Sequence, residues 1–107
     1  MNIEIKKGFD TIKLVVNDEW GGFAVPKVIQ DILHCERYPM EEDAFSVRTD
    51  ERFINWVLTH ADETSLAVVE IPDDATDWRI EDYDGIETVW VVVNGKMQIA
   101  ERKEMIK

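Results

Sequence analysis

The chain has 107 residues, of which 45% are hydrophobic and 33% charged, and a net charge of −11 at pH 7. This length predicts a single domain over residues 1–107, and the apolar content excludes a disordered chain. The negative charge repels nucleic acid and anionic membranes, so we expect neither as a partner. A single cysteine, Cys35, argues against a disulfide-stapled secreted protein. With no apolar leader at the N-terminus, the sequence predicts a cytoplasmic protein.

Two short strands are predicted to open the domain, over residues 3–6 and 11–16. Ile3 and Ile5 alternate with polar residues, and Ile12 and Leu14 follow the same period of two. This period places each apolar set on one face of a strand. A glycine between the two segments favours a hairpin.

A loop and a first helix are expected next. Residues 17–22 contain turn-forming residues, and Pro26 falls in the first turn of the helix, where a missing N–H costs nothing. Pro39 ends the segment, and residues 41–43 are expected to form an acidic linker. The buried face of this helix is predicted from helical spacing to contain Val25, Val28, Ile29, Ile32 and Leu33.

The second helix has a clearer start. Asp50 is a good N-cap, and the acid that follows it faces the positive end of the helix dipole. The positions i, i+3, i+4 and i+7 then hold Phe53, Trp56, Val57 and His60. We expect this most hydrophobic helix to lie at the centre of the core.

The second half of the chain predicts strands joined by short turns. Residues 66–71 are almost wholly apolar, which favours a buried strand, and residues 78–83 predict the next strand. Asp84 and Gly85 form a turn dipeptide. The β-branched residues of 86–93 predict a central strand.

The last predicted element is a hairpin. Asn94-Gly95 indicates a type I′ turn, so residues 96–100 should pair back with Met97 and Ile99 pointing inward.

The order of elements predicts an α+β fold. We expect an antiparallel or mixed sheet of about five to six short strands with two helices packed on one face.

From residue 47 onward the chain resembles a family of small uncharacterised proteins of bacteriophages and bacteria. The resemblance rests on an Arg-x-Asp helix start, a strand end reading VEIPDD and a strand-turn-strand reading DWxIEDYDGIE, which here are residues 48–50, 69–74 and 77–87. Gly21-Gly22-Phe23 is similar to an early motif of the same family. The chain departs from the family at its end, where a charged terminal segment is replaced by the hairpin. The resemblance implies a phage or prophage context and no enzyme activity.

Most of the negative charge lies in the middle of the chain, because residues 41–87 hold fifteen acids against three bases. Oxygen ligands at this density are typical of Ca²⁺ or Mg²⁺ sites. An EF-hand loop does not fit, because placing Gly85 at position six puts Ile80 and Val91 at ligand positions.

Turn chemistry is the competing explanation for these acids. Asp73 or Asp74 would cap a turn, Asp84 would make one, and Glu81 and Glu87 would lie on a solvated strand face. This explanation predicts no metal site and no cofactor.

Catalytic patterns are incomplete in this sequence. A nuclease motif beginning at Pro72-Asp73 would need an acid where Asn94 stands, so we reject it. Cys35 and His60 would form a dyad only if their helices packed together, and a core cysteine with an amphipathic histidine is far more common. We therefore expect no enzyme activity.

The four tryptophans are expected to divide between core and surface. Trp56 and Trp90 are predicted to lie in the core, Trp78 stands beside acids at a strand start, and Trp20 lies in a loop. An exposed tryptophan is a typical anchor for a protein partner, whereas packing over a core edge is the alternative for Trp20.

Three hypotheses of function follow. The first is a non-enzymatic accessory or protein-interaction domain of phage or prophage type whose acidic surface meets a basic protein, in its sharpest form a DNA mimic. The second is a divalent-metal-dependent binder or enzyme that uses the carboxylates of residues 73–87. The third is a structural component that forms a homodimer through a sheet edge. The candidate interaction residues are Trp20, Asp73, Asp74, Asp77, Trp78, Glu81, Asp82, Asp84 and Glu87.

Overall fold

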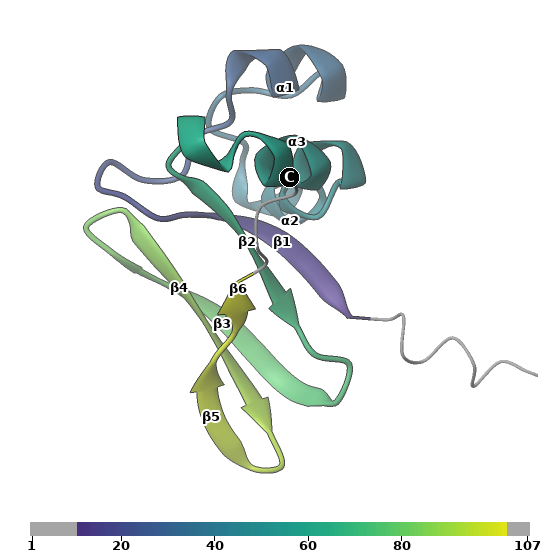
Figure 1. The fold of residues 1–107 in the computed structure, drawn as a ribbon, viewed down its shortest axis with the longest axis vertical. Coiled ribbons are helices and arrows are strands. Elements are labelled where there is room, and N and C mark those ends of the chain that lie inside the picture. Colours follow the sequence, from purple (N-terminus) through teal and green to yellow (C-terminus); the bar gives the residue numbers. More distant parts are fainter. Residues whose placement is uncertain (1–10, 103–107) are drawn as a thin grey trace, which may run out of the picture.

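The computed structural model describes residues 11–102 and shows an α+β fold with helices gathered on one side (Figure 1). The predicted strand over residues 3–6, and the hairpin that would join it to the next strand, lie outside the described residues. The elements are β1 (Ile12–Asn17), α1 (Lys27–Leu33), α2 (Glu41–Arg48), α3 (Glu51–Thr59), a 3₁₀ turn η2 (Ala61–Glu63), β2 (Leu66–Ile71), β3 (Ala75–Tyr83), β4 (Ile86–Val93), β5 (Lys96–Ile99) and β6 (Glu101–Arg102).

The strands form two antiparallel sheets of three strands each, in the orders β1-β2-β6 and β3-β4-β5. The predicted antiparallel pairing is confirmed, but the prediction of one sheet is wrong. The chain passes from one sheet to the other at Ala100, whose N–H donates to the carbonyl of Val89 at 2.9 Å. One residue later, Glu101 pairs with Glu70 of β2.

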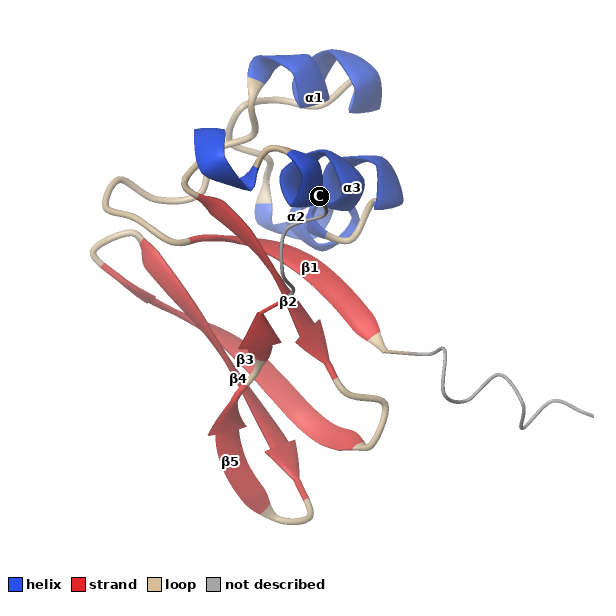
Figure 2. Ribbon diagram, viewed as in Figure 1, coloured by secondary structure: helices blue, strands red, loops and turns tan. Residues whose placement is uncertain are grey.

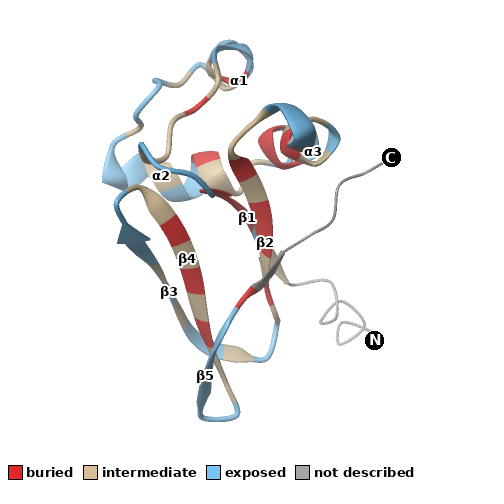
Figure 3. Cartoon of the chain, turned by 60° about the vertical axis from the view of Figure 1, so that its left-hand side comes forward, coloured by how far each residue is buried: buried red, intermediate tan, exposed pale blue. Residues whose placement is uncertain are grey.

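A second sheet is needed because the first is apolar on both faces. Val68 of β2 packs with the helices, whereas its neighbours Val69 and Ile71 pack in a separate core with Val89 and Val91 of β4. The layers therefore run helices, first sheet, second sheet (Figure 2). Figure 3 shows buried residues along β1 and β2 and at alternate positions of β4. The prediction of helices on one face is confirmed, and the second sheet covers the other.

The helices follow the sequence signals in part. In α3, Asp50 caps the helix by accepting from the N–H of Arg52 at 2.9 Å, and Phe53 and Val57 are buried as predicted. The expected linker at 41–43 is instead the first turn of a third helix, α2. Three acids in a first turn favour a helix start, because they face the positive end of the dipole.

The first helix buries less than its pattern predicts. Val25, just ahead of α1, and Ile29 within it are buried, but Val28 and Ile32 are 44% and 41% exposed. Pro26 is the N-cap rather than part of the first turn. The helix lies at the outer end of the helical layer in Figure 1, so only one edge of it meets the core.

Both predicted turns are confirmed. Asn94 and Gly95 have φ of 53° and 78°, as a type I′ turn requires. The inward orientation expected for Met97 and Ile99 is wrong, because these side chains are 54% and 59% exposed. They pair with Val92 and Trp90, and since Val89 and Val91 take the core face, the alternate positions of β4 and their partners face outward.

Gly85 is predicted to be far less tolerant of substitution than Gly95. Both have positive φ, which costs an alanine about 1–2 kcal/mol. A Cβ at Gly85 would also overlap the backbone N of Gly22 and lie 2.7 Å from that of Gly21, whereas a Cβ at Gly95 meets nothing within 4 Å. Overpacking of this kind adds about 1–3 kcal/mol.

Urea unfolding of Gly85→Ala and Gly95→Ala measures the difference. Equal losses of unfolding free energy in the two variants would contradict the close approach of the two loops.

Candidate functional site

The predicted interaction residues do not gather on one face. Four lie along β3, whose nine residues span about 30 Å. The four on β3 are Asp77, Trp78, Glu81 and Asp82. The others are Asp73 and Asp74 in the turn before β3, Asp84 in the turn after it, Glu87 on β4, and Trp20 in the loop after β1.

Glu87 is buried and paired, so its predicted place on a solvated strand face is wrong. The two terminal nitrogens of Arg48 donate to its carboxylate, Nη1 to Oε1 at 2.9 Å and Nη2 to Oε2 at 2.7 Å. Glu87 shares its phase on β4 with Val89 and Val91, which explains why it points inward. Only 4% of Glu87 is exposed.

Backbone groups and one aromatic ring complete this ion pair. The N–H of Asn17 donates to Glu87 Oε1 at 2.8 Å, and Arg48 Nη1 donates to the carbonyl of Val15 at 2.9 Å. The guanidinium carbon of Arg48 lies 3.9 Å from the centre of the Phe23 ring. Both charges thus have hydrogen-bonding partners, as burial requires. The two side chains, two backbone groups and one ring thus form a closed set of contacts around the buried charges.

Asn17 ties the surrounding loops to the ion pair. Its side-chain amide donates to the carbonyls of Glu19 at 2.5 Å and Gly85 at 2.6 Å, and its Oδ1 accepts from Ser65 at 3.0 Å. Gly85 in turn lies against Gly21 and Gly22. The Gly-Gly-Phe, Arg-x-Asp and Asp-Gly-x-Glu motifs, far apart in the sequence, therefore meet at one point.

Several β3 acids serve local structure. Asp82 Oδ1 accepts from the N–H of Gly85 at 2.9 Å, and Asp77 Oδ1 accepts from the N–H of Trp78 at 2.8 Å. Glu81 lies on the exposed face, as predicted, where its Oε1 accepts from the indole N–H of Trp90 at 3.1 Å. Turn and strand chemistry thus accounts for these carboxylates.

The tryptophans fall differently from their predicted places. Trp20 is 70% exposed, so the alternative that it packs over the core edge is wrong, and its role as an anchor stays a prediction. Trp78 is half-buried and packs against the core that contains Val89 and Val91. The centre of its ring lies 5.9 Å from that of Phe45. Trp56 and Trp90, both predicted to lie in the core, are half-buried.

The outward side of the second sheet carries an apolar strip that sequence reasoning missed. The strip consists of Trp90, Val92, Met97 and Ile99, which are neighbours across β4 and β5. Its one signal in the sequence is the continuous apolar run at 89–93. Successive residues of a strand point to opposite faces, so an unbroken apolar run with one face in the core leaves apolar residues on the opposite face. Beside the strip, β3 places Asp77, Arg79 and Glu81 in register with β4. We call these seven residues the outer face.

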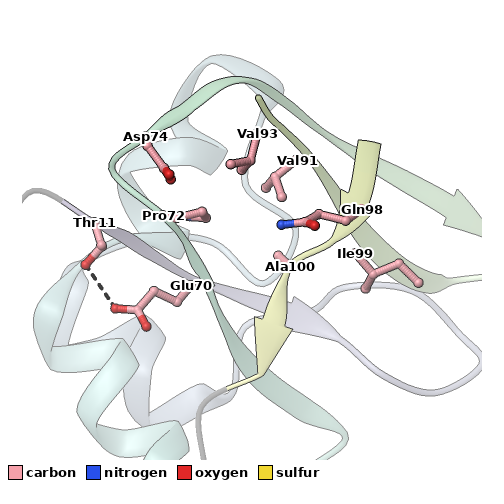
Figure 4. A pocket seen from close by; sticks show the side chains of 9 residues that line it. All are labelled: Thr11, Glu70, Pro72, Asp74, Val91, Val93, Gln98, Ile99 and Ala100. Carbon is pink, nitrogen blue, oxygen red and sulfur yellow. Dashed lines mark hydrogen bonds between the residues drawn. The ribbon is translucent and has the colours of Figure 1, made fainter. Parts of the chain in front are cut away.

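A pocket of about 310 Å³ lies on the other side of β5, between the end of β2 and the inner side of β4 (Figure 4). Apolar side chains form most of its wall. Gln98 points into it, Asp74 stands at one side, and Glu70 at another accepts a hydrogen bond from Thr11 at 2.9 Å. The lining residues are Thr11, Glu70, Pro72, Asp74, Val91, Val93, Gln98, Ile99 and Ala100.

His60, the imidazole of the candidate dyad with Cys35, contacts Trp56. His60 stacks on Trp56 with ring centres 4.5 Å apart, and its Nδ1 donates to the Trp56 carbonyl at 2.8 Å. Burial raises the pKa of the Cys35 thiol, and the charges of Asp50 and Glu36 raise it further. Within residues 11–102, no group of three or more His, Cys, Asp or Glu side chains is placed to hold a metal ion.

Comparisons of the chain with protein-family models, curated proteins and solved structures find no match. The resemblance to phage and bacterial proteins therefore stays a prediction from the sequence motifs. No helix within the described part of the chain is long and apolar enough to cross a membrane.

Breaking the Arg48–Glu87 pair from one side is predicted to be costly. Arg48→Met or Glu87→Gln leaves one buried charge uncompensated, which costs about 3–5 kcal/mol of unfolding free energy. The double variant should lose less than the sum of the two, because no charge is then left unpaired. Urea unfolding measures all three.

Lys27→Met is the matched control, because its pair with Asp31 is exposed and such pairs contribute at most about 1 kcal/mol. Strict additivity of the two single substitutions would show that the buried charges do not interact.

The thiol of Cys35 is predicted to react slowly near neutral pH. Because its pKa is raised, less thiolate is present than in the unfolded chain. The rate of alkylation by iodoacetamide, measured against pH, should have its midpoint above that of the chain in urea. His60→Gln should leave the midpoint unchanged, whereas a fall in the midpoint of the native chain below that in urea would indicate a thiolate–imidazole pair.

Proposed function

We propose that this chain is a non-enzymatic protein-binding domain that uses its outer face to bind a basic protein surface. The observation that carries the proposal is the apolar strip on the side of the second sheet that no other layer covers in the described structure. The phage or prophage accessory role implied by the sequence resemblance is the setting we propose for it.

The strip is unusual for the solvent side of an antiparallel sheet. Such sheets normally alternate apolar residues toward the core with polar residues toward water. Here β4 and β5 place Trp90, Val92, Met97 and Ile99 outward, and Met97 and Ile99 are more than half exposed. Aromatic residues and methionine are enriched in protein interfaces, and a contiguous exposed apolar patch marks a binding site.

Charge specifies the kind of partner. Asp77 and Glu81 border the strip, and the whole chain has a net charge of −11. A basic partner would be attracted over long range, which raises the rate of association. A second copy of the chain would be repelled, so this arrangement favours a different protein over a homodimer.

The outer face supports the protein-binding hypothesis better than its two alternatives. A DNA mimic needs a continuous acidic face, but Arg79 lies between Asp77 and Glu81, and an apolar strip adjoins them. A metal-dependent site needs converging carboxylates, whereas those of residues 73–87 spread along β3 and Glu87 is held by Arg48.

The proposal predicts that outer-face residues control capture of a basic protein. Met97→Ser with Ile99→Ser removes the apolar strip of β5 at exposed positions, so the fold should be kept. The immobilised variant should retain at least about tenfold less partner from a bacterial lysate than the unmodified chain, since buried apolar anchors carry most interface energy. Retention by the unmodified chain should fall at high salt.

Val28→Ser with Ile32→Ser is the matched control, because these α1 side chains are exposed to a similar extent. It should capture the partner as well as the unmodified chain. Equal capture by the outer-face variant, or a homodimer in light scattering that the outer-face variant abolishes, would refute the proposal of a basic partner.

A further inference from the structure

We propose that the partner adds an extended basic segment as a further strand to the free edge of β3. This inference rests on the proposed function and names the form in which the partner would present its basic residues. β3 is an edge strand, because its sheet has the order β3-β4-β5 and its other side pairs with no strand in the described structure. Figure 3 shows it at the margin of the molecule, with exposed residues along it.

The free edge of β3 is long and regular. Its register with β4 is irregular only between Ala75 and Asp77, and from Asp77 to Tyr83 it is unbroken. That stretch is at least as long as an ordinary strand of about five to six residues. It contains no proline, which would remove a donor from the edge. An incoming strand therefore meets a template of full strand length.

The turn after β3 decides which backbone groups face the free edge. Asp84 and Gly85 have φ of 55° and 93°, and Tyr83 pairs with Ile86 across them. Residues that flank a two-residue turn bond to each other, and the direction of the backbone groups then alternates along the strand. The residues whose N–H and C=O point away from β4 are therefore Trp78, Ile80 and Asp82.

A hydrogen bond at Trp78 agrees with this alternation. Its N–H donates to Oδ1 of Asp77 at 2.8 Å, as expected for a donor that β4 does not engage. The N–H and C=O groups of Ile80 and Asp82, together with the C=O of Trp78, face the position of an incoming backbone. Main-chain hydrogen bonds of this kind supply the affinity when a peptide adds a strand to a sheet edge.

The side chains between these positions specify a basic segment. Asp77, Arg79 and Glu81 are exposed, and toward an antiparallel strand they would take the non-hydrogen-bonded positions, where opposite side chains approach most closely. Basic residues opposite Asp77 and Glu81 would each face an acid, and a neutral residue suits the position opposite Arg79. An acidic segment would meet two like charges, which destabilise a cross-strand pair.

The existing contacts of the two acids leave their negative charges in place. Asp77 accepts from the backbone N–H of Trp78, and Glu81 accepts from the indole N–H of Trp90, so both donors are neutral. The closest approach of Arg79 to Glu81 is 4.0 Å, with both side chains more than half exposed. Such exposed pairs contribute at most about 1 kcal/mol, so both acids remain available to a basic strand.

The inward side chains of β3 complete the pattern that the edge would recognise. Trp78 and Ile80 are partly buried and pack against the core that contains Val89 and Val91. Apolar residues opposite Trp78 and Ile80 would extend this core at its rim, because side chains directly opposite each other on one face interact. The recognised segment is therefore extended and has the order basic, apolar, neutral, apolar, basic.

Strand addition on β3 leaves the apolar strip free for the rest of the partner. On β4, Trp90 and Val92 lie in register with Arg79 and Asp77, and the strip continues one strand further on β5. Neighbouring strands are about 4.8 Å apart, so the added strand would lie about 10 Å from β4. The edge would select an extended basic segment, and the strip would supply apolar contact.

A short peptide tests the edge without the partner. The full chain, labelled with ¹⁵N, is titrated with the capped peptide Thr-Lys-Val-Thr-Val-Lys-Thr, whose lysines lie opposite Asp77 and Glu81 when its valines oppose Trp78 and Ile80. We expect saturable shifts of the amides of Ile80 and Asp82. At saturation these two amides should exchange with solvent at least about tenfold more slowly, because they become hydrogen-bonded.

N-methylation provides matched control peptides. Methyl groups on the two valine nitrogens remove donors that would face β3, whereas methyl groups on the two lysine nitrogens remove donors that would face away. The first peptide should bind at least about tenfold more weakly than the second. Glutamates in place of the lysines should abolish the saturable shifts. Equal binding of the two methylated peptides, or of the lysine and glutamate peptides, would overturn the inference.

Two substitutions with the same change of charge provide matched variants. Glu81→Gln keeps an acceptor for the indole of Trp90 and should weaken peptide binding about threefold or more. Glu63→Gln, at an exposed position of η2, should leave binding nearly unchanged. The amide spectra outside β3 report whether each variant keeps the fold. Equal effects of the two substitutions, or a dimer in light scattering that the peptide dissociates, would also overturn the inference, the latter by showing that a second copy occupies the edge.

The outcomes are separable from those of the proposed function. If the peptide does not bind while Met97→Ser with Ile99→Ser still abolishes capture, the outer face stands and the partner does not add a strand to β3. If the peptide binds as expected but capture does not depend on the outer face, the protein-binding proposal fails and the edge of β3 remains a site for basic extended peptides.

Discussion

The buried pair of Arg48 and Glu87 is the interaction on which the three layers depend. Arg48 ends α2, Glu87 lies on β4, and the carbonyl and N–H that complete the site belong to β1. Removing two charges from water costs several kcal/mol for each ion, and only complete hydrogen bonding offsets this cost. Helices, first sheet and second sheet must therefore take one relative position, since any other leaves a charge unpaired. The pairs Lys27–Asp31 and Arg79–Glu81 are exposed, and the pair of Arg52 with Asp50 is partly exposed.

Fixing the second sheet in this way decides which of its sides meets solvent. Once Glu87 points at Arg48, the pleat carries Val89 and Val91 into the core and turns Trp90 and Val92 outward. The type I′ turn at Asn94-Gly95 then sets the register of β5, so that its outward residues are apolar as well. The exposed strip is thus a consequence of the buried pair and the turn together.

Local signals in the sequence were sufficient for much of the fold. The N-cap at Asp50, the apolar run of 66–71 and the Asn94-Gly95 turn each predict their element from neighbouring residues, and the structure has all three. The orientation of Met97 and the burial of Glu87 could not be read in the same way. The burial of Glu87 depends on a partner far along the chain, since Arg48 stands 39 residues before it. The orientation of Met97 follows that of its neighbour Val92 on β4, and a period of two does not say which phase of β4 faces the core.

The acidic residues in the middle of the chain have different structural roles. Glu87 is neutralised internally, Asp50 caps α3 and has a pKa lowered by its hydrogen bond from Arg52, and Asp82 holds a turn. What is left near the outer face is Asp77 and Glu81 along one side of the apolar strip, with Arg79 between them. Charge alone attracts any cation, and an apolar strip alone attracts any apolar surface. Their juxtaposition requires a partner that presents both basic and apolar side chains in one patch, which is the basis of selectivity in such interfaces.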